Sequence, residues 1–599
     1  MKGESTASAP PVNNRTSSGG YKTAEGTLYV SKPFRSKTSK KVRALITFAP
    51  RKSHFDTSNE SSGTNEFRGF FTLFWISIFI FTVRTYIRSI ETHGHALNLN
   101  FAARFSEDAI TLAISDFFVV LTTGLCVPFA KAVSKGWIKY HYTGMVLQHV
   151  LQTTLLFSAI VWTFNRQWPW VQSGYLTLHS IVMVMKMHSY MAVNGNLQVV
   201  LEQTKKLTDT LHKVATSTSG SFEKAVAEAI SHKASLVPSD DGSEKSLNTE
   251  ELSGTPEPEA DASGETRSAY VDLDTANALK QRLSVVAEPT AATVSDTIST
   301  TSEGLRKRAL AGATEKHVAD TNEQEDDPDN NENDPIRLLT NHPDHQVSDL
   351  AKDIIELQGE LRSTGPYPVQ YPNNITLKNF AVYQLIPSLV YQLEYPRTEK
   401  IRPGYVLEKT VATMGTFALL YTVTESFILP LTPTRDQSFL RSLLDLSLPF
   451  MIAYLLLFFI IFECICNGFA ELSYFADRQF YEDWWNSTSW DEFARKWNRP
   501  VHGFLLHHVY ASTISHWRVS RTTAMFLTFL LSACVHELVM VIVTKKFRMY
   551  LFWLQLIQLP LIAMSKLPVI RQNQTLGNIV FWLGLYAGFP LLCVSYVAY

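Results

Sequence analysis

The hydropathy pattern is the feature that most restricts the fold of this chain of 599 residues. About nine mostly apolar stretches interrupt otherwise polar sequence, and a helix of roughly 20 such residues crosses a bilayer. The first stretch begins Gly69-Phe-Phe-Thr-Leu-Phe-Trp-Ile-Ser-Ile-Phe-Ile-Phe-Thr-Val83. The pattern predicts an all-α, polytopic membrane helical bundle. The predicted spans are residues 69–90, 108–130, 143–164, 173–192, 407–430, 440–470, 521–544, 548–567 and 576–598.

Two long polar segments divide the membrane part. Residues 1–68 are rich in Ser, Thr, Gly and Lys, and residues 203–345 are dominated by Ser, Thr, Ala, Glu and Asp. Such segments cannot bury enough apolar surface to offset the entropy of ordering, so we expect a disordered basic tail and a disordered acidic linker. The membrane domain then has a first part, 69–202, with about four spans, and a second part, 346–599, with about five. A short amphipathic helix is expected at 346–362.

Charge sets the expected orientation. The tail carries Lys and Arg close to the first span and has no early apolar segment typical of a cleavable signal peptide. The positive-inside rule therefore predicts a cytosolic N-terminus, a cytosolic linker and a cytosolic loop at 471–520. The basic run lacks interleaved aromatic residues, and the whole chain is nearly balanced, with 54 Lys and Arg against 55 Asp and Glu. We therefore expect no nucleic-acid partner.

Several predicted spans contain polar residues that a simple anchor does not need. Ionisable groups inside a membrane are costly, so each one is a candidate functional residue. Any single one could instead make a satisfied hydrogen bond between helices. Together they indicate a polar cavity inside the bundle. These residues are His149, His179, Lys186, His188, Glu425, Glu463, His536 and Glu537.

His536 is the strongest candidate for chemistry, because it lies mid-span among apolar residues. A neutral imidazole can accept a proton from an alcohol if a partner orients it. Ser532 precedes it by four residues and lies on the same helix face, whereas Glu537 faces elsewhere. The span lacks the second His of a zinc protease helix, and the five cysteines have no zinc spacing, so we expect no metal.

Two polar–aromatic motifs precede this span. The segment Phe480-Tyr-Glu-Asp-Trp-Trp-Asn486 follows a predicted span directly. An interfacial aromatic belt is the simpler interpretation, but a belt does not need interleaved Asp and Asn. The second motif contains Trp497, Asn498 and Pro500. Because Pro suits the first turn of a helix, Asn498 is also a candidate N-cap with no chemical role.

These motifs together resemble the membrane-bound O-acyltransferase superfamily, and within it the sterol O-acyltransferase branch, most closely its fungal members. The resemblance extends through most of residues 366–599 and includes Tyr391-Gln-Leu-Glu-Tyr-Pro-Arg-Thr398. It implies that His536 is the catalytic residue and Asn498 its partner. It also associates the aromatic motif with acyl-CoA binding. It associates Trp497, His502 and Ser532 with the site less directly. The charge and position of Arg521 separately make it a candidate for binding the CoA phosphates. The acyl-CoA motif residues are Phe480, Tyr481, Asp483, Trp484, Trp485 and Asn486.

The resemblance implies the transfer of a long-chain fatty acyl group from acyl-CoA to the 3-hydroxyl of a sterol, ergosterol or one of its precursors, giving steryl esters for storage. Acyl-CoA would be a co-substrate, and no cofactor is expected. The resemblance further implies a homo-oligomer in the endoplasmic reticulum membrane.

Two other functions stay open from the sequence. A diacylglycerol O-acyltransferase would share the aromatic motif and the buried His, although Thr398 and Asp483 favour the sterol branch. A polytopic proton-coupled transporter could use intramembrane His and Glu residues as a relay. An internal inverted repeat would support a transporter, and the two halves show none.

Overall fold

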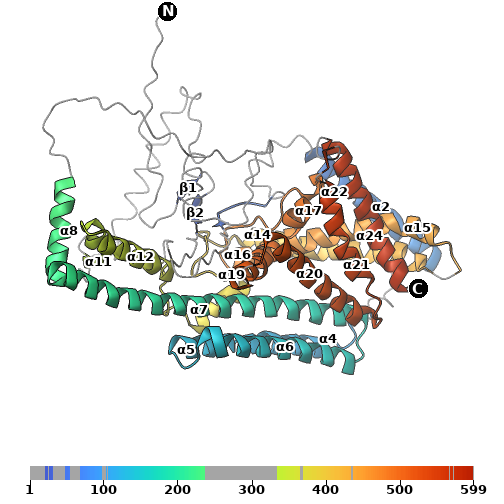
Figure 1. Cartoon of the computed structure of the whole chain (residues 1–599). Coiled ribbons are helices and arrows are strands. Elements are labelled where there is room, and N and C mark those ends of the chain that lie inside the picture. The colour runs from blue at the N-terminus through green and yellow to red at the C-terminus, as the bar shows by residue number, and fades with distance from the viewer. Residues whose placement is uncertain are drawn as a thin grey trace, which may run out of the picture. The chain divides into compact units, whose positions relative to one another are not determined.

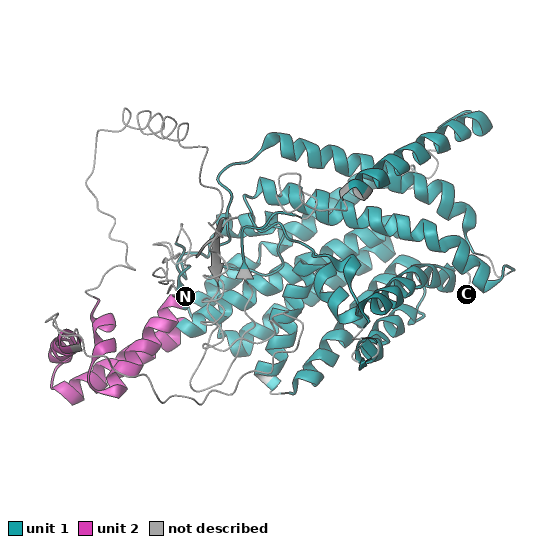
Figure 2. Ribbon diagram, turned by 90° about the horizontal axis from the view of Figure 1, so that it is seen from above, with its two compact units in different colours: residues 1–200, 266–280, 360–599 teal, residues 201–265, 281–359 magenta. Residues whose placement is uncertain are grey.

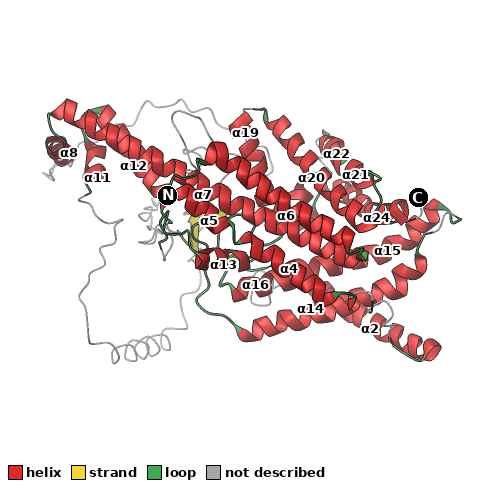
Figure 3. Ribbon diagram, turned by 90° about the horizontal axis from the view of Figure 1, so that it is seen from below, coloured by secondary structure: helices red, strands yellow, loops and turns green. Residues whose placement is uncertain are grey.

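The computed structural model describes most of the chain as helix (Figure 1 and Figure 3). The tail prediction and the centre of the linker prediction fall largely outside the described residues. The described residues are 21–23, 26–30, 47–53, 68–96, 103, 106–236, 334–363, 368–433 and 436–597, apart from 518, 566, 569, 571 and 572.

The described residues divide into two compact units (Figure 2). The first unit comprises residues 1–200, 266–280 and 360–599, and the second comprises 201–265 and 281–359. The first unit contains three short strands in one antiparallel sheet, β1 (Tyr21–Thr23), β2 (Gly26–Val30) and β3 (Thr47–Phe48). Apart from these strands, its described elements are helical.

The helices before the linker are α2, α4, α5, η1, α6 and α7. The letter η marks a short π- or 3₁₀-helix throughout. Their bounds are α2 (Arg68–His93), α4 (Ala109–Thr123), α5 (Cys126–Ser134), η1 (Tyr140–Gly144), α6 (Met145–Asn165) and α7 (Trp170–Ser219).

The helices after the linker form two groups. The first group contains α13 (Leu377–Leu385), α14 (Pro403–Val423), η3 (Thr424–Ile428), η4 (Leu429–Leu431), α15 (Phe439–Phe458), η5 (Phe459–Ile465) and α16 (Cys466–Leu472). The second contains η6 (Trp484–Asn486), α17 (Trp490–Trp497), α18 (Arg499–Phe504), η7 (Leu505–Tyr510), α19 (Ala511–Trp517), α20 (Arg521–Thr544), α21 (Tyr550–Leu556), α22 (Gln558–Ser565) and α24 (Gln574–Val597).

The predicted membrane bundle is confirmed. Within the described residues, seven helical stretches are long and apolar enough to cross a bilayer. Many of their Leu, Ile and Phe side chains are exposed, as lipid-facing surfaces require. The stretches are Thr72–His93, Ala109–Ser134, Tyr140–Asn165, Pro403–Leu431, Phe439–Leu472, Arg521–Thr544 and Gln574–Val597.

Two of the predicted spans are not among these seven. Residues 548–567 fall on the short apolar helices α21 and α22. Residues 173–192 fall in the first half of α7, which buries Lys186, Ser189 and Asn194. Such polar residues lower the hydropathy of this helix, and they are tolerated because protein rather than lipid surrounds them.

Two segments that are far apart in sequence are in direct contact. The backbone N–H of Arg51 donates to the Ala476 oxygen (3.1 Å), and that of Arg478 donates to the Arg51 oxygen (2.8 Å). Residues 47–53 and 475–478 therefore lie side by side, although five of the seven apolar stretches separate them in sequence.

The second unit has its own apolar core. The end of α7 packs with α8 (Phe222–Leu236), α11 (Pro335–Leu338), η2 (Leu339–Asn341) and α12 (His345–Leu361). The amphipathic helix predicted at 346–362 is confirmed by α12. The core residues are Leu211, Ala215, Ala225, Ala229, Leu339, Val347, Ala351 and Ile354.

Here the structure differs from the linker expected at 203–345. Residues 203–236 are helical, and 334–341 form α11 and η2, while 237–333 lie outside the described residues. The polar average of the segment conceals apolar residues at helical spacing, such as Leu207, Leu211 and Val214. These residues bury one face of α7, which offsets the ordering entropy there.

Candidate active site

His536 lies near the middle of α20, and its ring is exposed rather than packed into the core. Its Nδ1 is 2.7 Å from the backbone oxygen of Ser532 and 3.4 Å from the Ser532 hydroxyl. A carbonyl oxygen can only accept, so Nδ1 carries the proton. In the neutral ring Nε2 therefore keeps its lone pair, and none of the hydrogen bonds found among the described residues uses it. The expected position of Ser532 and His536 on one helix face is confirmed.

Glu537 points in another direction and is fully engaged. Its carboxylate accepts hydrogen bonds from the Tyr596 hydroxyl (2.9 Å) and from the backbone N–H groups of Met549 (2.8 Å) and Phe552 (3.1 Å). The last two donors lie at the start of α21, where a helix favours a negative charge. Glu537 thus joins α20 to α21 and α24, and it is structural.

Asn498 lies just before α18. Its side-chain oxygen accepts from the Val501 backbone N–H (3.1 Å), and Pro500 occupies the first turn. The N-cap expected from the sequence is therefore confirmed. Capping uses the side-chain oxygen, and among the residues that the structure describes the amide nitrogen has no hydrogen-bond partner.

The helical run that begins at Asn498 packs against the helix that carries His536. This run continues from α18 through the π-helix η7 into α19, and both η7 and α19 contact α20. The described residues contain no direct hydrogen bond between Asn498 and His536. The structure thus brings their helices together, while any shared role requires a substrate between the two side chains. Single π-turns within longer helices are frequent at functional sites.

The aromatic motif is mostly an internal anchor. Phe480, Tyr481 and Trp484 are buried, whereas Asp483 and Trp485 are half-buried and Asn486 is exposed. The buried members fix the loop, and the accessible polar members are the ones that can meet a ligand.

Trp497 takes part in the same anchor. Its indole stacks on Tyr454 of α15, with ring centroids 4.6 Å apart, and meets Trp484 edge to face at 4.9 Å. Phe458 completes the cluster against both tryptophans. Such aromatic pairs each contribute about 0.5–1.5 kcal/mol beyond burial of their area.

The last membrane helix also holds the motif loop. Asn578 and Trp582 of α24 donate to the backbone oxygen of Trp485 at 3.0 and 3.1 Å. A Cβ atom at Gly584 would lie 2.6 Å from the ring of Trp490 in α17, so glycine at this position lets α24 pack closely on α17. The loop is therefore fixed from two sides, by α15 and by α24.

Asp483 has a cationic partner. Lys496 lies 3.1 Å from its carboxylate and donates to Glu492 as well. Burial alone would lower the pKa of Lys496, but hydrogen bonds to Glu492 and Asp483 raise it above its usual value. Lys496 therefore stays charged and pairs with Asp483, close in sequence to the exposed Asn486.

The remaining predicted site residues lie apart from the loop. His502 is half-buried on α18, and burial, with Arg495 and Arg499 nearby, lowers its pKa to about 4. Arg521 is exposed at the start of α20, about 15 residues from His536 in sequence. A rise of 1.5 Å per residue places them roughly 22 Å apart along the helix. Arg521 therefore cannot contact His536, but such a distance fits the two ends of one elongated ligand.

Comparison with known proteins identifies the family. The sequence model described as MBOAT, membrane-bound O-acyltransferase family, matches residues 154–598. This chain belongs to the membrane-bound O-acyltransferase family. The match includes α20, the aromatic motif and the Asn498 cap. The chain is thus an acyltransferase, and transport is not needed to explain its polar membrane residues.

Fungal acyltransferases are among the relatives. The chain is 29% identical over 565 residues to a probable sterol O-acyltransferase 1 of Schizosaccharomyces pombe, covering 92% of this chain and 86% of the relative. It is 40% identical over 244 residues to a sterol O-acyltransferase 2 of Saccharomyces cerevisiae, covering 38% of each. It is also 35% identical over 234 residues to a diacylglycerol O-acyltransferase 1 of Dictyostelium discoideum, covering 38% of this chain and 37% of the relative.

Several of the polar membrane residues in this acyltransferase are structural. Lys186 donates to the oxygens of Tyr383 (2.8 Å), Gln384 (3.2 Å) and Ile386 (2.7 Å), at the end of α13. A cation at a helix C-terminus is favourable. Glu463 receives the Lys409 ammonium at 2.9 Å. For these two residues, the satisfied interhelical contact is the correct interpretation.

His188, which the sequence indicated as a candidate, lies in a group with His507 and His508, which it did not indicate. His188 has Nδ1 3.0 Å from the Gln148 amide nitrogen, and its ring lies 5.2 Å from that of His508. His508 Nε2 lies 2.7 Å from the Ser189 hydroxyl, and His507 lies beside it. The closeness of His502, His507 and His508 in sequence could have predicted this group. Within the described residues, no group of three or more His, Cys, Asp or Glu is placed to hold a metal.

Proposed function

We propose that this acyltransferase joins a long-chain fatty acyl group from acyl-CoA to the 3-hydroxyl of a sterol. The observation that carries the proposal is the His536 ring, whose Nδ1 donates to Ser532 and whose Nε2 takes part in no hydrogen bond among the described residues. A base of this kind suits an alcohol acceptor. The sterol is suggested by the fungal relatives, two of which are named sterol O-acyltransferases.

The chemistry is a direct transfer. Nε2 of His536 takes the sterol hydroxyl proton as the oxygen attacks the thioester carbonyl carbon. The new C–O bond forms, the C–S bond breaks, and CoA leaves as a thiolate that recovers the proton from the imidazolium. No acyl-enzyme is needed. Cys534 is two residues from His536, so its side chain points elsewhere on α20.

Asn498 is proposed to orient a substrate group through its side-chain nitrogen, because its oxygen is held by the cap. The accessible polar members of the aromatic motif, Asp483 and Asn486, are proposed to face the acyl-CoA head group. Arg521 is proposed to face the CoA phosphates from the end of α20. No cofactor takes part in this scheme, and acyl-CoA is a co-substrate.

The proposed setting is the endoplasmic reticulum membrane, with the N-terminus in the cytosol and the protein acting as a homo-oligomer. The basic tail supports this orientation by the positive-inside rule. CoA is strongly charged and stays in the cytosol, while a sterol is confined to lipid. Sterol esters made there would be stored as neutral lipid.

The test uses microsomes from cells that lack endogenous sterol esterification. Labelled oleoyl-CoA is supplied with ergosterol or with a diacylglycerol, and the products are separated. We expect labelled steryl ester from the wild-type chain and none from His536→Ala. Labelled triacylglycerol without steryl ester would refute the sterol assignment and favour the second candidate, a diacylglycerol acyltransferase, which the Dictyostelium relative suggests.

A further inference from the structure

Residues 47–53, called here the N-terminal strap, lie far from the catalytic motifs in sequence but make direct contact with them. The Arg51 guanidinium forms a two-pronged ion pair with Asp477, at 3.0 Å for Nε–Oδ1 and 2.6 Å for Nη2–Oδ2. Asp477 is 6% exposed and also accepts from the Ala49 backbone N–H at 3.2 Å. Paired planar groups of this kind give both strength and a defined orientation.

The backbone of the strap continues the contact. Arg51 exchanges backbone hydrogen bonds with Ala476 and Arg478, as one strand does with a parallel neighbour. Phe48 packs edge to face on Tyr395 and Phe475, with centroids 5.5 and 6.0 Å away. The partner segment therefore has its backbone, one carboxylate and one ring held by the strap.

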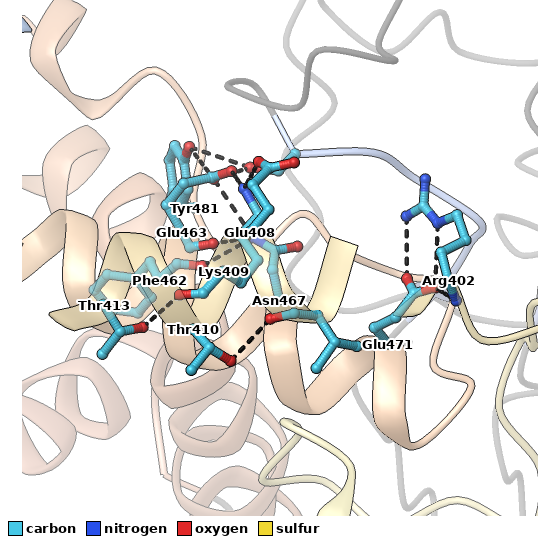
Figure 4. Close-up of polar contacts among 12 residues, drawn as sticks. Arg402, Glu408, Lys409, Thr410, Thr413, Phe462, Glu463, Asn467, Glu471 and Tyr481 are labelled. Atoms are coloured by element: carbon cyan, nitrogen blue, oxygen red, sulfur yellow. Dashed lines mark hydrogen bonds and ion pairs between the residues drawn. The ribbon is translucent and has the colours of Figure 1, made fainter. Parts of the chain in front are cut away.

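The end of the strap enters the protein interior. The Ser53 side chain is 1% exposed, and its hydroxyl donates a short hydrogen bond to Glu463 and lies 3.2 Å from the Tyr481 hydroxyl. Tyr481 donates to the same Glu463 carboxylate (3.1 Å), which also holds Lys409 (Figure 4). Ser53 and Tyr481, the tyrosine of the aromatic motif, thus bind the same buried carboxylate.

The partner segment leads directly into that motif. Only Gln479 separates Arg478 from Phe480, so a shift at 476–478 must move the start of the 480–486 loop. The strap fixes this loop at its N-terminal end, whereas α15 and α24 fix its middle. The strap is therefore placed to set the position of Asp483 and Asn486 relative to the rest of the site.

We propose that the N-terminal strap is a positioning element for acyl-CoA binding, with Arg51 and Ser53 as its positioning residues. This inference rests on the proposed acyl-CoA role of the 480–486 loop. The strap sets the affinity for acyl-CoA and leaves the chemical step at His536 unaffected.

The first experiment exchanges the charges of the ion pair in the full-length chain. Arg51→Glu and Asp477→Arg are each expected to raise the KM and Kd for oleoyl-CoA about tenfold, or ~1.4 kcal/mol, with kcat and the sterol KM unchanged. The double variant is expected to return to within about threefold of wild type, because opposite charges again face each other. Lys52→Glu is the matched control, since Lys52 is adjacent and exposed. Single variants with unchanged acyl-CoA affinity, or a double variant no better than the singles, would overturn the proposal.

The second experiment replaces the ion pair by a covalent link. Residues that face each other on neighbouring strands suit a disulfide, so Arg51→Cys/Asp477→Cys should cross-link on oxidation. Mass spectrometry detects this link without any activity, and photolabelling with an acyl-CoA analogue measures binding without any sterol. We expect weak binding in reductant and wild-type binding after oxidation.

These experiments test the role of the strap independently of the proposed reaction. If no cross-link forms, the strap does not dock on residues 476–478. If the cross-link forms but acyl-CoA binding stays weak, the strap does not position the acyl-CoA site. If the wild-type chain forms no steryl ester, the proposed function fails, while cross-linking and photolabelling still decide the role of the strap. Ser53→Asp, which places a carboxylate beside Glu463, is expected to weaken acyl-CoA binding more than Ser53→Ala.

Discussion

The adjacent residues His536 and Glu537 lie on two faces of α20 and differ in burial and in hydrogen bonding. Glu537 is buried and receives three donors, so its charge is used to join helices. His536 is exposed and binds its own helix through Nδ1, and its Nε2 has no hydrogen bond within the part of the chain that the structure describes. The difference teaches that an ionisable residue in a membrane helix is not by itself a sign of catalysis. Unused hydrogen-bonding capacity is the better sign.

The largest effect is expected on the open face of the helix. His536→Ala should reduce turnover by at least about 10²–10⁴-fold, because general base catalysis is lost. His536→Gln is the matched variant, since its amide can still donate to Ser532 but cannot take up a proton. Steryl ester formation by purified protein measures both variants. Normal turnover in either variant would break the comparison between the two faces.

Substitution of Glu537, on the buried face, should lower the free energy of unfolding instead of the turnover. Glu537→Ala leaves Tyr596 and two backbone N–H groups without their acceptor, and we expect a loss of about 3 kcal/mol or more, because each buried donor left unsatisfied costs about 1–3 kcal/mol. Glu537→Gln keeps one acceptor oxygen and should lose less. Thermal unfolding in detergent gives the difference. Catalytic loss at full stability would instead place Glu537 with His536.

The side-chain oxygen of Asn498 caps α18, and its side-chain nitrogen is the proposed substrate contact. A substitution can separate the two roles. Asn498→Asp keeps the cap oxygen, so stability should change little, whereas Asn498→Ala should cost about 1 kcal/mol. If the side-chain nitrogen orients substrate, Asn498→Asp should still lose turnover. Steady-state rates and unfolding temperatures of both variants decide this. An active Asp variant would reduce Asn498 to a cap.

The smallest expected effect concerns His502. Its pKa is lowered to about 4 from 6.5, so the folded protein binds fewer protons there than the unfolded chain does between these values. Its contribution to stability is therefore complete above pH 6.5 and is lost as the pH falls towards 4. His502→Gln should flatten this slope, and His345→Gln, at an exposed position, should not. Unfolding temperature against pH is the measurement; equal slopes in both variants would refute the buried neutral histidine.

The motifs could be read from the sequence because each is local. The i, i+4 relation of Ser532 and His536, the cap at Asn498 and the helix at 346–362 depend on spacing along one element, and the structure confirms them. The linker boundaries could not be read in this way. The burial of Leu211 depends on α8 and α12, which lie elsewhere in the chain.

Hydropathy and helical periodicity thus predicted a polytopic helical bundle, since both are properties of short segments, and the resemblance of the motifs indicated an acyltransferase. Only the tertiary structure decided which of the polar membrane residues are bound by other parts of the chain. Lys186 and Glu537 are bound by partners on other elements, whereas no bond among residues of known placement reaches the Nε2 atom of His536. The tertiary structure also seated Arg51 on Asp477, 426 positions away in sequence, because contacts over such separations are fixed by packing rather than by local pattern.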